Sequence, residues 1–343
     1  MSLPDEKYMA MALQEAMKSW GLTTPNPMVG AIAVKDGKVI GRGHHHRAGA
    51  PHAEVELLRR IGAEAEGCTV YVNLEPCSTA GRTPPCTDAL IAAEVAEVVI
   101  GNIDPNPAHA GRGVRLLEAA GIAVRGGVLE NECRQLNRAF FKWITEGKPF
   151  VLLKMAMTLD GKIADSDGNS KWISGPVARS RVQELRRWAD AIMVSGKTVR
   201  LDRPRLTVRE PDDWPRQPRK FIAADNMSLE EIKGYFPDDP TVEKHCFANA
   251  AEFDAFLSRL GGENITAILI EGGGELAGAL IEWGMVDAVE FHIAPKLLCG
   301  RGSIPVTGGE NLPLASAVKL VNFRSENRGG DLIVTADVMK EEN

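Results

Sequence analysis

The sequence contains no hydrophobic run long enough to cross a membrane, no internal repeat and no low-complexity tract. A transmembrane helix needs about 20 consecutive, mostly apolar residues, so we expect no membrane association. Residues 1–8 are acidic and polar, which is not the pattern of a secretory signal or of an Arg-rich transit peptide. The composition, with 44% hydrophobic and 25% charged residues, is typical of a globular protein.

An excess of positive charge is also missing. The 40 Lys and Arg residues are outnumbered by 46 Asp and Glu residues, which gives a formal net charge of −6. Proteins whose main partner is duplex nucleic acid usually carry the opposite balance, so we expect no nucleic-acid partner. Six cysteines in a chain without an export signal favour a reduced, cytoplasmic protein, in which cysteines are more often buried, metal-binding or catalytic than disulfide-bonded.

The 343 residues are enough for two domains of ordinary size. Apolar, β-branched segments alternate with segments of helical spacing along the chain, which predicts α/β layering with helices covering a sheet. The turn Glu146-Gly147-Lys148-Pro149 ends a predicted helix, and a buried strand then restarts the alternation. We therefore expect a first domain at 1–147 and a second at 148–343.

Local patterns predict the individual helices and strands. Asp36-Gly37 between two apolar runs is a strong signal for a β-hairpin formed by residues 29–34 and 38–43. Helices are expected over 5–20, 53–61, 87–95, 113–120, 131–146, 177–189, 250–260 and 275–283. Further strands are expected over 68–74, 97–101, 122–126, 149–157, 191–196, 206–209, 220–226, 265–271 and 288–298, with a strand pair within 316–338.

One histidine and two cysteines in the first domain stand where predicted strands meet predicted helices. His52 opens the helix at 53–61, Cys77 follows the strand that ends in Asn-Leu-Glu-Pro, and Cys86 completes a C-x8-C spacing. These are the ligands of a catalytic Zn²⁺ that keeps its fourth position for water. Glu54, two residues after the histidine, can reach that water without being a ligand and can move protons to the ring nitrogen and the leaving amine. The pattern predicts a zinc deaminase site.

Nucleic-acid and nucleoside deaminases use a C-x-x-C spacing instead. The C-x8-C spacing, together with segments 26–34, 41–55 and 101–107, resembles the pyrimidine-nucleotide deaminase of riboflavin biosynthesis. The resemblance implies a cytidine-deaminase-like α/β/α layer domain with one Zn²⁺ held by His52, Cys77 and Cys86, and with Glu54 as general acid and base. It further implies that substrate-binding loops present Asn26, His45, Arg82, Asn102 and Asp104. Arg82 suits a phosphate group, and a solvated loop arginine is the alternative interpretation.

The second domain contains a glycine-rich turn, Gly272-Gly273-Gly274, between an apolar strand and a helix. Glycines let a backbone approach phosphate groups, and a helix N-terminus attracts anions. A tight structural turn would have the same sequence. Gly196-Lys197-Thr198 does not complete a P-loop, because that motif would need a glycine where Ala191 stands. Segments 154–164, 170–174, 183–188, 195–209 and 270–284 together resemble the reductase half of the same bifunctional family.

That resemblance implies a dihydrofolate-reductase-like α/β domain that uses NADPH. The implied cofactor-binding residues are Ala156, Trp172, Thr198, Asp202, Gly273 and Gly274. The implied substrate contacts are Ser170, Arg186, Leu206, Arg209 and Glu271, of which the two arginines suit a ribose phosphate.

Four side chains of this domain need separate comment. An ordinary core tryptophan is the alternative interpretation of Trp172. Lys154 and Asp202 are the ionisable groups that we consider for proton supply. Cys299 stands where the family commonly has glycine, and we expect it to be a buried thiol.

The resemblance covers residues 5–338 and implies a bifunctional riboflavin-pathway enzyme. A zinc-dependent first domain would deaminate 2,5-diamino-6-ribosylamino-4(3H)-pyrimidinone 5′-phosphate, and an NADPH-dependent second domain would reduce the ribosyl side chain to ribityl, giving 5-amino-6-ribitylamino-2,4-pyrimidinedione 5′-phosphate. The expected partner is this small pyrimidine ribosyl phosphate, and the resemblance is compatible with a homo-oligomer. One alternative is a nucleic-acid or nucleoside deaminase with a reductase-like accessory domain, which the C-x8-C spacing and the negative charge disfavour. The other is a binding or regulatory protein with decayed sites, which the intact motifs disfavour.

Overall fold

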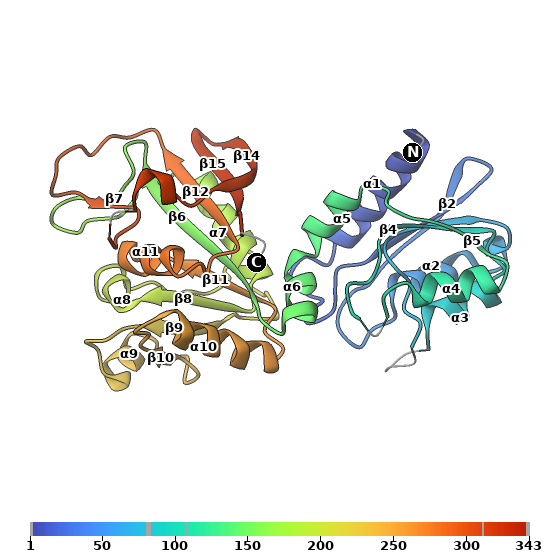
Figure 1. Cartoon of the computed structure of the whole chain (residues 1–343), viewed down its shortest axis with the longest axis horizontal. Helices are drawn as coiled ribbons and strands as arrows, with labels where there is room; N and C mark the ends of the chain where they lie inside the picture. The colour runs from blue at the N-terminus through green and yellow to red at the C-terminus, as the bar shows by residue number, and fades with distance from the viewer. Residues whose placement is uncertain (1–2, 80–83, 108, 311, 341–343) are drawn as a thin grey trace. The chain divides into compact units, whose positions relative to one another are not determined.

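The computed structural model describes residues 3–79, 84–107, 109–310 and 312–340. The chain divides into two compact units, Met1–Gly147 and Lys148–Asn343, each with its own sheet and hydrophobic core (Figure 1). Among the described residues, no helix is long and apolar enough to cross a membrane. We describe the two units separately below as unit 1 and unit 2.

Unit 1 is built on a five-stranded sheet with the order β2-β1-β3-β4-β5. The predicted hairpin forms, with Asp36 and Gly37 both at positive φ in its turn. The strands are β1 (Gly30–Lys35), β2 (Lys38–His44), β3 (Thr69–Leu74), β4 (Glu97–Asn102) and β5 (Ala123–Arg125). Strands β3, β4 and β5 run parallel to one another, so the loops that follow β3 and β4 leave the same edge of the sheet.

Helices cover both faces of this sheet. On one face, α1 (Leu3–Met17) packs Met9 and Ala12 against Ile32 of β1. On the other face lie α2 (Ala53–Ile61), α3 (Cys86–Ala92) and α4 (Arg112–Ala119). A short 3-10 turn, Gly62–Ala65, extends α2. The resulting layers confirm the expected α/β/α architecture.

The single helix expected over 131–146 is wrong. Two helices occupy this segment, α5 (Glu130–Leu136) and α6 (Arg138–Glu146), and Asn137 between them leaves the helical conformation. The Asn137 side chain accepts a hydrogen bond from the Met28 amide at 2.8 Å and donates one to the Met28 carbonyl at 2.9 Å. This contact spans 109 residues, so helical periodicity carries no sign of it.

Unit 2 contains an eight-stranded sheet with the order β10-β9-β8-β11-β6-β12-β15-β14. The strands from β10 to β12 are parallel, and the C-terminal hairpin of β14 and β15 adds antiparallel to β12. Their bounds are β6 Phe150–Thr158, β8 Ala191–Ser195, β9 Arg219–Ala223, β10 Glu243–His245, β11 Ala267–Glu271, β12 Ala288–Ala294, β14 Leu320–Arg328 and β15 Asp331–Val338. A separate ribbon pairs β7 (Lys162–Ala164) with β13 (Ile304–Pro305).

Helices also cover both faces of the second sheet. Apolar side chains of α10 (Ala250–Gly262) and α11 (Gly274–Glu282) form a core with β6, β8 and β11 on one face. Helix α7 (Pro176–Trp188) covers the opposite face, where two of its arginines reach acidic residues of the sheet. Two short helices, α8 (Gly196–Asp202) and α9 (Leu229–Tyr235), follow β8 and β9, and a 3-10 turn lies at Leu314–Ser316.

The strand expected over 206–209 is also wrong, because this segment is a loop. Its backbone bonds go to side-chain amides instead of to a neighbouring strand. Gln217 accepts from the Val208 amide at 2.8 Å and donates to the Val208 carbonyl at 3.2 Å, and Gln183 accepts from the Arg209 amide at 2.8 Å. Leu206 is buried at a positive φ of 53°, which an extended strand excludes.

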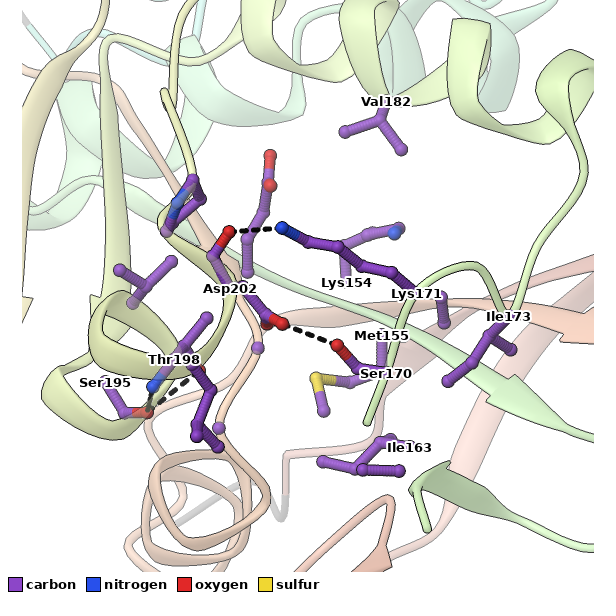
Figure 2. A pocket seen from close by; sticks show the side chains of 18 of the residues that line it. Lys154, Met155, Ile163, Ser170, Lys171, Ile173, Val182, Ser195, Thr198 and Asp202 are labelled. Carbon is purple, nitrogen blue, oxygen red and sulfur yellow. Dashed lines mark hydrogen bonds between the residues drawn. The ribbon is translucent and has the colours of Figure 1, made fainter. Parts of the chain in front are cut away.

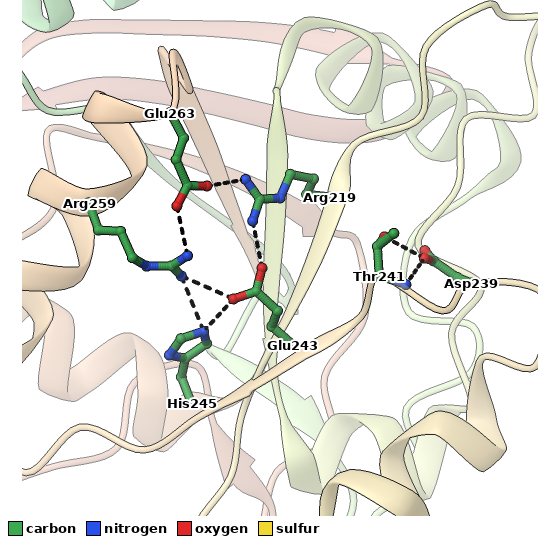
Figure 3. Close-up of polar contacts among 7 residues, drawn as sticks. All are labelled: Arg219, Asp239, Thr241, Glu243, His245, Arg259 and Glu263. Atoms are coloured by element: carbon green, nitrogen blue, oxygen red, sulfur yellow. Dashed lines mark hydrogen bonds and ion pairs between the residues drawn. The ribbon is translucent and has the colours of Figure 1, made fainter.

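Charged side chains cover the edge of the sheet at β10 (Figure 3). Arg219 and Arg259 each contact both Glu243 and Glu263, and His245 lies 3.3 Å from Glu243. Partly exposed ion pairs contribute little individually. Charges on an edge strand also oppose pairing with another chain, and we assign this network that structural role.

Candidate active sites

Three side chains of the metal-ligating type converge in unit 1. His52 lies immediately before α2, Cys86 is the first residue of α3, and Cys77 lies in the loop after β3. His52 Nδ1 is 3.3 Å from Cys86 Sγ and 3.4 Å from Cys77 Sγ, and the two sulfur atoms are 3.4 Å apart. No other group of three or more His, Cys, Asp and Glu side chains with ligand atoms this close was found in the described part of the chain.

The chemistry of this group fits Zn²⁺. Hydrogen bonds from Cys86 and His52 lower the pKa of Cys77 to about 4, so this sulfur is a ready thiolate donor. Thiolate and imidazole ligands together suit zinc. Glu54, in the first turn of α2, is buried, and its Oε2 atom has no hydrogen-bond partner among the described residues. Such an unpartnered buried oxygen is typical of a group whose partner is the bound water or substrate.

Asn26 and His45 lie beside this cluster. His45 is buried, and the edge of its ring faces the ring of His52 at a centroid distance of 5.2 Å. Its Nδ1 is 3.0 Å from the Pro51 carbonyl, which can only accept, so Nδ1 carries the proton. Nε2 therefore accepts from the Asn26 amide at 3.1 Å. Burial lowers the pKa of His45, which favours this neutral tautomer.

The other three predicted substrate contacts have different surroundings. Asp104 follows β4, burial raises its pKa, and its Oδ1 accepts from the Asn106 amide at 2.8 Å. The buried Asn102 amide donates to the Glu130 carbonyl at 2.7 Å, which ties β4 to the start of α5. Arg82 lies outside the described residues.

Sequence reasoning missed Glu75, which orders the loop that contains Asp104. This buried carboxylate accepts hydrogen bonds from four backbone amides, those of Asp104, Gly111, Gly113 and Val114, at 2.8–3.3 Å. The sequence feature that could have indicated Glu75 is an acidic residue directly after a buried strand, two positions before Cys77. The neighbouring cysteine motif is the stronger pattern, and Glu75 was therefore not singled out.

Unit 2 contains a cavity of about 730 Å³ at the carboxyl ends of β6, β8 and β11 (Figure 2). Open α/β sheets bind ligands at this edge, and the volume is within the range of cofactor sites. Every residue that the second-domain resemblance implied lies in its lining, namely Ala156, Ser170, Trp172, Arg186, Thr198, Asp202, Leu206, Arg209, Glu271, Gly273 and Gly274. Lys154 lies there as well.

The glycine turn forms one wall of this cavity. Gly272 and Gly273 have φ values of 84° and 96°, which non-glycine residues rarely adopt. A Cβ atom on Gly273 would lie 2.6 Å from the Ser195 hydroxyl, so a larger residue does not fit. The turn leads directly into α11, whose N-terminus suits an anionic group. These features fit the phosphate groups of NADPH.

Arg186 and Glu271 form a closed pair inside the cavity wall. The Arg186 Nε and Nη2 atoms donate to the two carboxylate oxygens of Glu271 at 2.9 and 2.7 Å, and Nη1 donates to the Thr207 carbonyl at 3.1 Å. All three nitrogens of this guanidinium thus have protein partners. Arg209 is exposed at the cavity, and burial together with the charge of Arg186 lowers its pKa. Of the two predicted arginines, Arg209 is therefore the one that remains for a phosphate group.

The structure decides between the two interpretations of Trp172 and corrects the expectation for Cys299. Trp172 is 64% exposed, with the Arg179 guanidinium 4.5 Å from its ring centre, so it is not a core tryptophan. Cys299 is exposed, and the expectation of a buried thiol is wrong. The reason is that β12 ends at Ala294 and Cys299 lies in the loop beyond, where its amide donates to Asp160 at 2.8 Å. Its φ of 57° is one that glycine adopts at lower cost.

Known proteins resemble both units. The cytidine and deoxycytidylate deaminase zinc-binding region matches residues 3–102, and the RibD C-terminal domain matches residues 149–334. The riboflavin biosynthesis protein RibD of Escherichia coli is 40% identical over 356 residues, covering 94% of this chain and 96% of that protein. The RibD protein of Aquifex aeolicus is 39% identical, covering 96% and 97%. The chain belongs to the RibD family.

Solved structures agree with this assignment. Acinetobacter baumannii RibD, form 1, superposes with a TM-score of 0.88 at 33% identity, covering 98% of this chain and 99% of that one. The Thermotoga maritima diaminohydroxyphosphoribosylaminopyrimidine deaminase/5-amino-6-(5-phosphoribosylamino)uracil reductase superposes with a TM-score of 0.83 at 32% identity and the same coverage. The predicted RibD-type fold and the bifunctional riboflavin-pathway activity, deaminase and reductase, are thereby confirmed, with Zn²⁺ and NADPH as the fitting cofactors. A nucleic-acid deaminase is not favoured.

Proposed function

We propose that unit 1 deaminates 2,5-diamino-6-ribosylamino-4(3H)-pyrimidinone 5′-phosphate and that unit 2 reduces the ribosyl side chain of the product to ribityl. The convergence of His52, Cys77 and Cys86 beside the unpartnered Glu54 oxygen is the observation that carries this proposal. The deaminase and reductase activities of the Thermotoga maritima relative, which matches 98% of this chain, support the choice of substrate.

In unit 1, Zn²⁺ bound by His52, Cys77 and Cys86 would lower the pKa of a coordinated water. The chain itself supplies the proton transfer. Glu54 has one carboxylate oxygen without a partner among the described residues, so it can take a proton at that atom and pass it to the ring nitrogen and to the leaving amine. Hydrolysis then replaces the amine by a carbonyl oxygen and releases ammonia. Asn26 and His45, held together beside His52, would orient the pyrimidine ring.

In unit 2, the turn at Gly273 and Gly274 would hold NADPH, which when bound would supply the hydride that reduces C1′ of the sugar. As the bond between C1′ and the ring oxygen breaks, that oxygen needs a proton to become a hydroxyl group. We assign this proton to Lys154, which lines the cavity, is 9% exposed and forms no hydrogen bond or ion pair with any described residue. Asp202 is less suited, because its carboxylate already accepts from the Ser170 hydroxyl at 2.5 Å (Figure 2). Arg209 would hold the phosphate.

A two-channel assay on zinc-loaded protein tests this division of labour. Ammonia release reports on unit 1, and NADPH oxidation with supplied deaminated product reports on unit 2. Glu54→Gln should keep zinc, lower ammonia release by about 10²–10⁴-fold and leave NADPH oxidation unchanged. Arg209→Ala should have the converse effect. If either substitution abolished both activities in folded protein, the assignment to two separate sites would be refuted.

We also propose that the chain self-associates through β14. This strand lies exposed at the sheet edge and presents three apolar side chains, those of Leu320, Val321 and Phe323. The Phe323 side chain is 65% exposed. Unprotected apolar edge strands are typical of interfaces. Sedimentation should show a dimer or a larger assembly, and Phe323→Arg should weaken this association; a wild-type monomer at all concentrations would refute this idea.

The cytoplasmic location and the absence of a nucleic-acid partner stay predictions.

A further inference from the structure

Three charged residues form a row across the centre of the second sheet. Lys154 lies on β6, and the strand register places Glu271 of β11 and Glu290 of β12 directly opposite it on either side. Residues opposite each other on adjacent strands project from the same face, here the face that α7 covers. Lys154 and Glu271 line the cavity, whereas Glu290, 1% exposed, is not part of the lining.

Both carboxylates are held from helix α7. Arg186 binds Glu271 through two nitrogens, as described above. Arg181 binds Glu290 in the same manner, with Nε and Nη2 at 3.1 and 2.9 Å from the two carboxylate oxygens. His292 adds a third contact at 2.9 Å from Glu290 Oε1. These contacts lower the pKa of Glu290 to about 2, so it is an anion throughout the neutral range.

Lys154 therefore lies between two fixed anions without bonding to either. Burial lowers the pKa of Lys154, and the neighbouring carboxylates oppose this effect. The charged and titratable groups that face it are Glu271 from β11, Glu290 and His292 from β12, and Arg181 and Arg186 from α7. Glu271 and Arg186 act on the lysine in opposite directions. Glu290, on the other side of Lys154, adds to the support that Glu271 gives the charged form of the lysine.

We propose that Glu290 is a positioning residue for the reduction, which keeps the Lys154 ammonium charged and in place from behind the cavity. This inference rests on the proposed role of Lys154 as proton source. Glu290 itself is not part of the cavity lining, and Lys154 lies between it and Glu271 in the row. No pattern in the sequence marks Glu290, since its importance follows from strand register alone.

The test is the pH dependence of NADPH oxidation with supplied deaminated product, measured on the full zinc-loaded chain. If Lys154 supplies the proton, the rate should fall as pH rises through the pKa of that lysine. Glu290→Gln keeps the shape of the side chain and removes its negative charge, so the alkaline limb of the pH profile should move to lower pH by up to about one unit. Glu290→Asp keeps the charge and should shift the limb in the same direction by less.

Glu184→Gln is the matched control. Glu184 also bonds Arg181, at 2.8 Å, but it is partly exposed on α7 and has no place in the row. The control should leave the limb where it is in the wild type. NADPH binding, followed by fluorescence, and thermal unfolding establish that each variant is folded. Ammonia release should be unchanged in all of them.

The outcomes separate this inference from the proposed function. If Lys154→Gln keeps the full rate and the alkaline limb, the proton role of Lys154 fails and the role of Glu290 fails with it. Lys154→Gln could instead be inactive while folded Glu290→Gln and Glu290→Asp both keep the alkaline limb of the wild type. In that case the proton role of Lys154 stands, and the inference about Glu290 is overturned. Equal shifts in Glu290→Gln and Glu184→Gln would assign the effect to Arg181 and would also overturn it.

Discussion

Glu75 allows a sharp test of how unit 1 holds its substrate-binding loop. Its Oε1 accepts from the amides of Gly113 and Val114, and its Oε2 accepts from those of Asp104 and Gly111. The substitution Glu75→Gln keeps the size of the side chain. It replaces one carboxylate oxygen by an NH₂ group, which can only donate, so two of the four backbone amides lose their acceptor.

The magnitude follows from these contacts. A buried donor left without an acceptor costs about 1–3 kcal/mol, and hydrogen bonds to charged groups are worth about 1.5–3 kcal/mol each. Two lost bonds give a range of about 2–6 kcal/mol. Three of the four contacts are only partly buried, so water can replace some of the loss. We expect the free energy of unfolding of unit 1 to fall by about 3 kcal/mol.

The assay is urea unfolding at fixed zinc concentration, combined with hydrogen exchange of the four amides that donate to Glu75, those of Asp104, Gly111, Gly113 and Val114. Exchange of these amides should accelerate, and ammonia release should fall with them, while NADPH oxidation by unit 2 stays unchanged. Glu118→Gln is the control, because Glu118 is exposed on α4, the helix that also contains Gly113 and Val114. It should change the free energy of unfolding by less than about 0.5 kcal/mol. A Glu75→Gln variant within 1 kcal/mol of wild type would refute the reasoning.

Four further predictions follow from other contacts. Removing zinc with a chelator should abolish ammonia release and spare NADPH oxidation; loss of both activities would contradict separate sites. Lys296→Met should raise the KM for NADPH several-fold with little change in kcat, because Lys296 donates to the carbonyls of Trp172 and Ile173 at 2.7 and 2.8 Å and so holds this cavity-lining segment; steady-state kinetics decide this. Asn137→Ala should cost about 2 kcal/mol in urea unfolding, since it removes two buried bonds to one backbone position. Glu290, whose pKa is about 2 in the fold against an ordinary value near 4.5, should stabilise unit 2 by about 3 kcal/mol above pH 5, and this gain should disappear as pH falls towards 2; acid unfolding should therefore depend less on pH in Glu290→Gln.

Local sequence signals were sufficient where a residue's environment is set by its own segment. The turn at Asp36-Gly37 depends on two residues that accept positive φ, so the hairpin was predictable. His52 and Cys86 were predictable for a related reason. Each stands at the start of a helix, and each helix follows from the spacing of its own apolar residues.

The resemblance also identified which segments of the second domain meet. Residues as far apart as Ala156 and Gly274 line one cavity, because parallel strands bring their carboxyl ends to a single edge of the sheet. The sequence indicated the ends of these strands. It did not indicate which of the two predicted phosphate-binding arginines, Arg186 and Arg209, is already paired, because the pairing of Arg186 with Glu271 spans 85 residues.

The sequence by itself determined the alternation of strands and helices, the zinc-type ligand set and the glycine turn, since each depends on residues close together in the chain. Only the tertiary structure decided that Asn137 interrupts a helix and that residues 206–209 are not a strand. It also decided that Glu75 accepts from four backbone amides and that Glu290 lies opposite Lys154 on the neighbouring strand. Periodicity reports which side of a helix or strand is buried. It does not report the partner that a buried polar group finds, because that partner comes from another element and is fixed only when strand register and helix packing are fixed.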